Sequence, residues 1–222
     1  PAMAKKYDNV ILATGIIPRK PKITGIDHPK VVSYIDVLND KVKIGSKVAL
    51  IGAGGIGFDV AEYLSHKGES SSLKTKLFME EWGVDMKFTA RGGIQKVNPK
   101  PLETKRQIYL MQRKSGKVGS SLGKTTGWIH RFSLRNKDVK MVNNVKYNKI
   151  DDKGLNYFKN NKEFILDVDH IVICAGQLSN NKIFDSCKEQ NPNTEIIGGA
   201  FHAFELDAKK AIDQAVRSAA KV

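Results

Sequence analysis

Apolar residues in this chain fall into short runs of strand length, most of them followed by small residues or by a segment with helical spacing. Lys47–Ile51 is one such run, and residues 52–57 join it directly to a helical pattern that ends near Leu64. Further strands are expected at residues 107–111, 139–142 and 168–173, and a further helix at residues 126–136. Strands that alternate with helices in this way indicate an α/β fold built on a parallel, Rossmann-like sheet.

Two segments depart from this alternation. Residues 145–165 alternate apolar and polar positions between polar breaks, which predicts a small antiparallel meander in place of a crossover helix. Residues 66–104 lose their periodicity among serines, glycines and prolines. We interpret this second segment as an insertion that contains one short helix near residues 78–82.

An apolar strand that ends in small residues occurs twice, at residues 7–15 before the Rossmann-like pattern and at residues 168–176 at the end of that pattern. Turn residues at Gly45 and Ser46 separate the first of these strands from that pattern. After the second, one more strand and one more helix are expected, at residues 193–199 and 208–220. We therefore expect three segments, at residues 1–45, 46–178 and 179–222.

The composition is that of an ordinary folded, soluble chain. Its 222 residues are 41% hydrophobic and 27% charged, which is enough to bury one good core or two small ones. It has no apolar run of about 18 residues and no export signal near its first residue, so neither a membrane partner nor secretion is expected. Cys174 and Cys187 make no CxxC or metal-ligand pattern. A reducing cytoplasm is the expected location.

The chain is strongly basic, with a formal net charge of +14. The excess is central: residues 105–140 contain ten Lys and Arg side chains but only one acidic residue, Asp138. A field of this sign attracts phosphate groups, whether they belong to a small ligand or to a nucleic acid. We keep a basic nucleic-acid-binding module only as a minor alternative and expect no nucleic-acid partner, because no recognition motif accompanies the charge.

The glycine motif at residues 52–57 has the spacing GxGxxG, with a strand before it and a helix after it. The first glycine permits the tight turn, the second lets a pyrophosphate approach the backbone, and the third lets the helix lie close to the strand. The N-terminus of the helix then presents N–H donors and a partial positive charge to the phosphates. The cofactor-binding residues predicted here are Gly52, Gly54, Gly55, Ile56 and Gly57.

The end of the strand at residues 107–111 decides between NAD and NADP. An acidic side chain at this point would hydrogen-bond the ribose hydroxyl, whereas basic side chains accommodate a 2′-phosphate. Arg113 and Lys114 follow the strand, and no acid lies near them in the sequence. We therefore predict that the nucleotide is NADPH and that Arg113 and Lys114 bind its extra phosphate.

No catalytic residue and no metal ligand is predicted in this chain. The string Gly123-Lys124-Thr125 lacks the earlier glycine that a P-loop requires, because position 118 is Val118. The five histidines show neither HExxH nor another paired metal spacing, and no serine nucleophile elbow is present. Hydrolase and metalloenzyme functions therefore find no support.

Several strings, taken together, resemble a known family. ATGIIPRKP at residues 13–21, GAGGIGFDVAEYL at 52–64, VICAG at 172–176 and IIGGAFHAFELDAKKAIDQA at 196–215 resemble the ordered signatures of two-dinucleotide-domain flavoprotein reductases. In those proteins an NAD(P)H domain is inserted into an FAD domain. The strings LMQRKSGK at 110–117 and LGKTTGWIHR at 122–131 narrow the resemblance to the bacterial NADPH-dependent 2,4-dienoyl-CoA reductases.

The resemblance implies a role for each segment. Residues 46–178 would form the NADPH domain, and residues 1–45 and 179–222 would be pieces of an FAD-binding domain with a partial flavin site. Asp59 stands where relatives often place a glutamate near the nicotinamide, so a positioning role is implied for it. The further cofactor-binding residues that the resemblance implies are Ala13, Thr14, Gly15, Ala175, Gly176, Glu205, Leu206 and Asp207.

The resemblance also implies an activity. In the family, an N-terminal portion carries FMN, an iron–sulfur cluster and the substrate, and this portion would be the partner of the present chain. NADPH would pass a hydride to FAD, and the electrons would finally reduce a 2,4-dienoyl-CoA in the β-oxidation of unsaturated fatty acids. The chain alone would bind NADPH without turnover. The alternative is another flavin-dependent NAD(P)H oxidoreductase or amine dehydrogenase of the same architecture.

Overall fold

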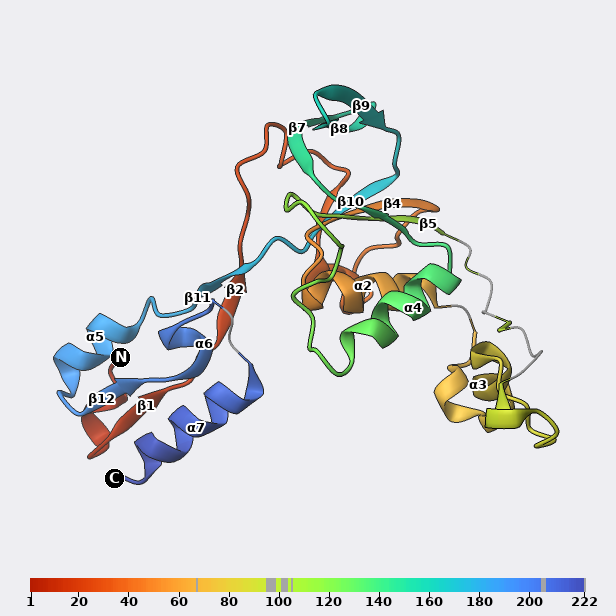
Figure 1. Ribbon diagram of the computed structural model, residues 1–222. Helices are drawn as coiled ribbons and strands as arrows, with labels where there is room; N and C mark the ends of the chain where they lie inside the picture. Colours follow the sequence, from red (N-terminus) through yellow and green to blue (C-terminus); the bar gives the residue numbers. More distant parts are fainter. Residues whose placement is uncertain (67, 95–98, 101–103, 105, 205–206, 222) are drawn as a thin grey trace. The chain divides into compact units, whose positions relative to one another are not determined.

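The computed structural model contains two compact units, which are described separately (Figure 1). The larger unit is Lys20–Ala175, and the smaller unit combines Pro1–Arg19 with Gly176–Val222. The structure describes residues 1–66, 68–94, 99–100, 104, 106–204 and 207–221.

A five-stranded parallel sheet forms the centre of the larger unit. Its strand order is β3 (Val31–Ser33), β10 (His170–Ile173), β4 (Lys47–Ile51), β5 (Gln107–Met111) and β6 (Lys140–Val142). The helices α2 (Gly55–Ser65) and α4 (Gly127–Asn136) lie against one face of the sheet. An antiparallel meander of β7 (Val145–Asp151), β8 (Gly154–Lys159) and β9 (Lys162–Leu166) lies on the other side (Figure 1). The predicted α/β fold with a parallel sheet and a meander is confirmed.

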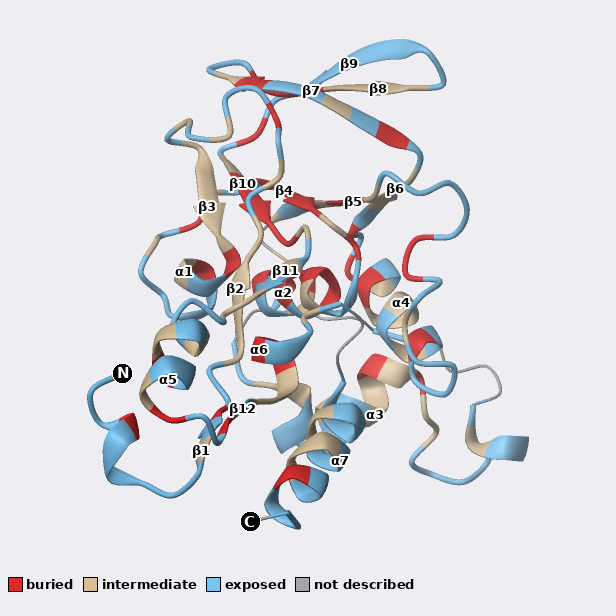
Figure 2. Cartoon of the chain, turned by 90° about the vertical axis from the view of Figure 1, so that its left-hand side faces the viewer, coloured by how far each residue is buried: buried red, intermediate tan, exposed pale blue. Residues whose placement is uncertain are grey.

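Most residues of the central strands β4, β5 and β10 are buried (Figure 2). Their side chains alternate between two cores, one on each face of the sheet. In β4, Val48 and Leu50 belong to the core on the helix side, whereas Ala49 and Ile51 belong to the core shared with the meander. A continuous apolar run is the pattern expected of a parallel strand that is covered on both sides.

Within the segment interpreted as an insertion, α3 (Thr75–Trp82) packs against α4 through aromatic and charged side chains. The ring centroid of Trp82 lies 5.3 Å from that of Phe132, and the two rings are stacked. Lys137, whose side chain is only 4% exposed, hydrogen-bonds Glu62 of α2 and lies 3.9 Å from the carboxylate of Glu81. This lysine therefore links α2, α3 and α4.

We expect Lys137→Ala to lower the free energy of unfolding by about 3 kcal/mol, because it leaves the largely buried Glu81 carboxylate without its cation. Urea denaturation followed by tryptophan fluorescence measures this change, since both tryptophans of the chain lie in the cluster around Trp82. Lys140→Ala is the matched control. It breaks an exposed pair with Asp138 and should cost less than about 1 kcal/mol. Equal losses for the two variants would contradict the linking role of Lys137.

The smaller unit has two short sheets and a small core. Strands β1 (Val10–Leu12) and β12 (Thr194–Ile196) pair in parallel, and β2 (Ile16–Pro18) pairs antiparallel with β11 (Gln177–Ser179). Its core consists of Ala4, Leu12 and Cys187, with Val10, Phe184 and Ile196 packed against them. The helical elements of this unit are η1 (Ala4–Lys6), α5 (Phe184–Gln190), α6 (Gly198–Phe201) and α7 (Ala208–Ala219).

Both boundaries differ from those expected from the sequence. The first unit was expected to end at residue 45, yet residues 20–45 belong to the larger unit, because β3 is the edge strand of its sheet. At the other end, residues 176–178 belong to the smaller unit, because β11 pairs with β2. Each of these strands has three residues, too few for a periodic pattern to show. The helix α1 (Tyr34–Leu38) follows β3 directly, and the Ser33 side chain accepts a hydrogen bond from the N–H of Ile35 at its start.

In the part of the chain that the structure describes, no helix has the length and apolar character needed to cross a membrane.

Candidate nucleotide-binding site

Three neighbouring parallel strands of the larger unit end at one edge of the sheet, and the predicted nucleotide residues follow them. Ile51, the last residue of β4, is in register with Met111 of β5 and with Ile173 of β10. The turns that follow therefore begin side by side. In open α/β sheets, ligands bind outside the carboxyl ends of the strands, which is where these turns lie.

The turn after β4 requires glycine at two positions. Gly52 adopts a φ of 114°, and a Cβ at this residue would lie 2.4 Å from the carbonyl oxygen of Cys174. The N–H of Gly52 donates a hydrogen bond to the carbonyl of Met111, with an N–O distance of 2.9 Å. A Cβ at Gly57 would lie 1.9 Å from the carbonyl oxygen of Gly52. The first turn of α2 therefore packs directly on the strand that precedes it.

The N-terminus of α2 is open to a ligand. Gly54 is the N-cap residue and provides no side chain to cap the first-turn amides. A Cβ at Gly54 or at Gly55 would have no neighbour within 4 Å, so free space lies beside both residues. The first amides of a helix have no acceptor within the helix and carry a partial positive charge. This helix end is therefore suited to an anionic group such as a pyrophosphate. Ile56, by contrast, packs against the core on the helix side.

The predicted basic pair lies on a turn that backbone hydrogen bonds hold in place. The N–H of Gln112 donates to Val142, 2.8 Å away, and the N–H of Asn144 donates to the carbonyl of Lys114, 3.1 Å away. The side-chain amide of Gln112 also donates to the Lys114 carbonyl, at 3.1 Å. Both basic side chains are exposed. The turn is thus fixed by its backbone while Arg113 and Lys114 stay available to a ligand.

The glycine turn and the basic pair line one cavity of about 200 Å³. The residues around it are Ile51, Gly52, Ala53, Gly54, Gln112, Arg113, Lys114, Ser121, Tyr147 and Ala175. The structure therefore brings together the two halves of the predicted nucleotide site, which are about 60 residues apart in the sequence. Their role in binding remains a prediction.

Sequence reasoning missed five residues of this cavity: the apolar neighbours Ile51 and Ala53, and three residues with polar side chains. Gln112 and Ser121 belong to polar turns that gave no specific signal. Tyr147 lies in the alternating segment at residues 145–165, where an aromatic residue at an inward position indicates core packing rather than a site. Only the path of the meander over the sheet shows that Tyr147 reaches the cavity.

Other predicted residues lie elsewhere. Asp59 is exposed on α2 and does not line the cavity. Gly176 belongs to the smaller unit, where its carbonyl accepts a hydrogen bond from the N–H of Arg19 at 3.0 Å. Its φ of 94° favours glycine.

Two of the predicted flavin-binding segments lie against each other in the smaller unit. The N–H of Asn180 donates to the carbonyl of Gly15 at 3.0 Å, and the Asn180 side-chain amide donates to the carbonyl of Thr14 at 3.1 Å. A Cβ at Gly199 would lie 2.6 Å from Ile16, so the segment that begins at Gly198 packs closely on the strand end that carries residues 13–15.

The end of this second segment is only partly described. The Asp207 carboxylate accepts a hydrogen bond from the N–H of Lys210, at 2.8 Å, and so acts as the N-cap of α7. Glu205 and Leu206 lie outside the described residues. The flavin contacts implied for these three residues remain a prediction.

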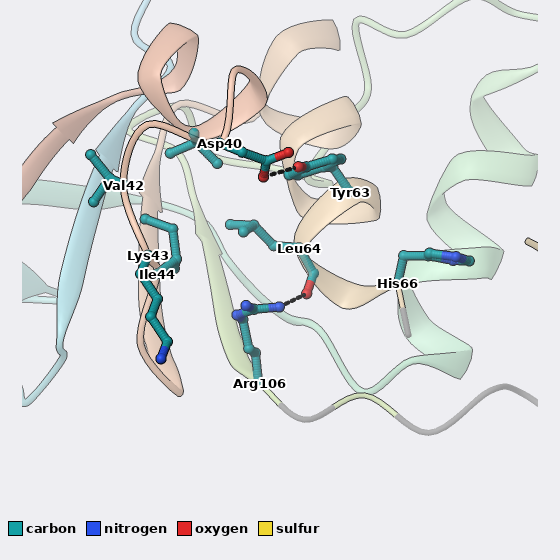
Figure 3. Close-up of a pocket in the computed structure, with 9 residues that line it drawn as sticks. Asp40, Val42, Lys43, Ile44, Tyr63, Leu64, His66 and Arg106 are labelled. Carbon is teal, nitrogen blue, oxygen red and sulfur yellow. Dashed lines mark hydrogen bonds between the residues drawn. The ribbon is translucent and has the colours of Figure 1, made fainter. Parts of the chain in front are cut away.

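A larger cavity, of about 460 Å³, lies at the other end of α2 (Figure 3). There the Tyr63 hydroxyl donates to the Asp40 carboxylate at 2.5 Å. The guanidinium of Arg106 donates to the carbonyl of Leu64 at 3.0 Å. Arg106 thus satisfies one of the last carbonyls of the helix. None of the predicted nucleotide residues lines this cavity.

The basic residues between positions 105 and 140 differ in what their side chains contact. Arg106 binds Leu64, Arg131 donates to the carbonyl of Gly119 at 2.8 Å, and Lys137 is buried beside Glu62. Of the described cations, Arg113 and Lys114 are those that line the cavity of the glycine turn. The high charge of this segment therefore partly reflects internal contacts.

The two cysteines are free and buried, and they belong to different units. Burial raises the pKa of the Cys174 thiol to about 12. This thiol is therefore protonated at neutral pH, and a protonated thiol is a poor nucleophile. The chain supplies no cysteine pair for dithiol chemistry.

Comparison with known proteins defines the class. A family model described as pyridine nucleotide-disulphide oxidoreductase matches residues 3–199. The chain belongs to this family, and it is an NAD(P)H oxidoreductase-type domain of a flavoprotein.

The individual proteins that the chain resembles share less than 30% sequence identity with it. The chain is 24% identical over 216 residues to a metal reductase of Desulforamulus reducens and 28% identical over 204 residues to a cinnamate reductase of Clostridium sporogenes. These alignments cover 97% and 87% of this chain but only 31% and 24% of those proteins, so the chain spans less than a third of their length. Among solved structures, a 2-naphthoyl-CoA reductase in complex with 2-naphthoyl-CoA shares the fold. Its TM-score is 0.75 at 21% identity, over 100% of this chain and 28% of that chain.

Proposed function

We propose that this chain is the NADPH-binding part of a flavoprotein reductase that transfers a hydride from NADPH to FAD, and that the intact enzyme reduces 2,4-dienoyl-CoA thioesters. One observation carries the nucleotide assignment. The open helix N-terminus at Gly54 and the cations of Arg113 and Lys114 line the same cavity at the carboxyl ends of β4 and β5. Among the residues that the structure describes, no acidic one lines that cavity.

The residues fit NADPH in chemical terms. The free space beside Gly54 and Gly55 admits a pyrophosphate to the first-turn amides of α2, and the basic pair supplies the positive charge that a 2′-phosphate requires. When bound, the nicotinamide supplies the hydride. The protein holds and orients the nucleotide, and the redox chemistry belongs to the cofactors.

For FAD, the smaller unit offers two backbone segments that pack together, residues 13–15 and the segment from Gly198. We propose that they contact the flavin. They form a partial site, which agrees with a chain that spans less than a third of its relatives. The FMN, the iron–sulfur cluster and the substrate would then be held by an N-terminal portion of the same enzyme.

The substrate proposal rests on the sequence strings at residues 110–117 and 122–131 and gains support from the relatives. Cinnamate is a carboxylate conjugated to a carbon–carbon double bond, and naphthoyl-CoA is an aromatic acyl-CoA thioester. A 2,4-dienoyl-CoA combines these two features, because its conjugated double bonds are attached to a thioester.

The test of the whole activity uses the full-length enzyme with its cofactors. We expect it to oxidise NADPH at least tenfold faster with a 2,4-dienoyl-CoA than with cinnamate or without an acceptor, measured by absorbance at the nicotinamide band. If an amine reduced the bound flavin in the absence of NADPH, the enzyme would instead be an amine dehydrogenase of the same architecture. Faster turnover with cinnamate would also contradict the dienoyl-CoA assignment.

A further inference from the structure

Tyr147, on β7, has a buried hydroxyl group without a hydrogen-bond partner in the described structure. Its ring packs against the core shared by the sheet and the meander, and its side chain lines the cavity that also contains Gly52 and Arg113. An unsatisfied buried hydroxyl is unfavourable, so native proteins rarely retain one without a reason. Because the Tyr147 side chain lines the cavity, a ligand bound there could provide the missing partner of the hydroxyl group.

The local strand geometry also singles out Tyr147. The register between β7 and β8 shifts between Tyr147 and Lys149, so a bulge interrupts the regular alternation at this point. Bulges often occur next to active sites, where they change the direction of a side chain. The bulge next to Tyr147, as well as its position in the meander, thus sets the direction of its side chain.

The hydroxyl group is in the right protonation state to act as a donor. Burial raises the pKa of Tyr147, and the nearby Arg113 guanidinium opposes this shift without cancelling it. The phenol therefore keeps its proton at neutral pH. Among the described residues that line the cavity, Arg113 is the one whose charge acts on this group. The Tyr147 hydroxyl and the proposed binder of the 2′-phosphate are consequently neighbours.

We propose that Tyr147 is a specificity-determining residue whose hydroxyl donates a hydrogen bond to the 2′-phosphorylated ribose of NADPH. This inference rests on the proposed function of the cavity. The nucleotide supplies the hydrogen-bond acceptor that the Tyr147 hydroxyl lacks. Arg113 recognises the charge of the phosphate, and the Tyr147 hydroxyl adds a directional hydrogen bond. An ordered water is the competing partner, and the test separates the two.

Tyr147→Phe removes only the hydroxyl. We expect the variant of the 222-residue chain to bind NADPH about tenfold more weakly, and to lose a similar factor for 2′,5′-ADP, which carries the phosphorylated ribose without the nicotinamide. Binding of NADH should change by less than about threefold. The melting temperature without nucleotide should stay the same or rise, because an unsatisfied group has been removed. Isothermal titration calorimetry and thermal unfolding measure these quantities.

Tyr157→Phe is the matched control. Tyr157 pairs with Tyr147 across the meander and stacks on Phe164 at a centroid distance of 5.4 Å, but it does not line the cavity. Its replacement should leave every nucleotide affinity unchanged.

Each other outcome has a definite meaning. Unchanged NADPH affinity in Tyr147→Phe overturns the inference, and so does a lower melting temperature with unchanged affinity, which would indicate a water-mediated structural role. Weaker binding of NADPH with unchanged binding of 2′,5′-ADP overturns the assignment to the phosphorylated ribose. If the wild-type chain binds neither NADPH nor 2′,5′-ADP, the proposed function of the cavity itself fails.

Discussion

Replacing Arg113 by alanine is expected to remove most of the preference of this chain for NADPH over NADH. A hydrogen bond to a charged group contributes about 1.5–3 kcal/mol, which corresponds to a loss of roughly tenfold to a hundredfold in NADPH affinity. Affinity for NADH, which lacks the 2′-phosphate, should change little. Titration of the wild-type chain and of Arg113→Ala with both nucleotides measures the difference.

Lys117→Ala is the matched control, because it removes the same single positive charge as Arg113→Ala. Lys117 is exposed and lies close to Arg113 in the sequence, but it does not line the cavity. If long-range attraction alone held the phosphate, both variants would lose the same small factor, and that factor would vanish at high salt. A wild-type chain that binds NADH as tightly as NADPH would refute the phosphate assignment altogether.

Replacing Gly57 by alanine is expected to destabilise the larger unit by about 3 kcal/mol, a large share of the stability of a typical domain. The new Cβ would lie 1.9 Å from the carbonyl oxygen of Gly52, and because that atom is backbone, the start of α2 has to move away from β4. The same movement displaces the glycine turn, so NADPH binding should also be lost. Urea denaturation and titration with NADPH measure the two effects.

Gly54→Ala separates binding from stability. A Cβ at Gly54 has no protein neighbour within 4 Å, so this variant should keep its stability to within about 1 kcal/mol. It should still bind NADPH more weakly, because the methyl group occupies the space through which a pyrophosphate would approach. A Gly54→Ala variant that binds like the wild type would show that no phosphate lies at this turn.

The larger unit could be predicted because its main elements have clear patterns. β4, the glycine turn and α2 follow one another in a continuous stretch, and each has the length its pattern needs. The edge strand β3 and the pairing of β2 with β11 could not be predicted, since three-residue strands are defined by their partners rather than by periodicity. The bounds of the two compact units differ from the expected segments for the same reason.

The candidate site was predictable where it depends on the backbone. Gly52 and Gly57 are required by close backbone contacts, Gly54 leaves free space at the helix N-terminus, and the spacing of all three is visible in the sequence. Arg113 and Lys114 follow a recognisable strand. Tyr147 could not be found in this way, because its contribution depends on how the meander crosses the sheet. Its buried hydroxyl becomes informative only when the absence of a partner among the described residues is seen.

The turn that carries Arg113 and Lys114 owes its shape to bonds made by main-chain atoms and by Gln112, with Val142 and Asn144 as partners. Neither basic side chain contributes to those bonds. If these two side chains bind the nucleotide as proposed, they can be replaced without loss of the turn, because the hydrogen bonds that hold it come from other atoms. Substitutions at positions 113 and 114 are therefore the first choice for changing which nucleotide the chain prefers.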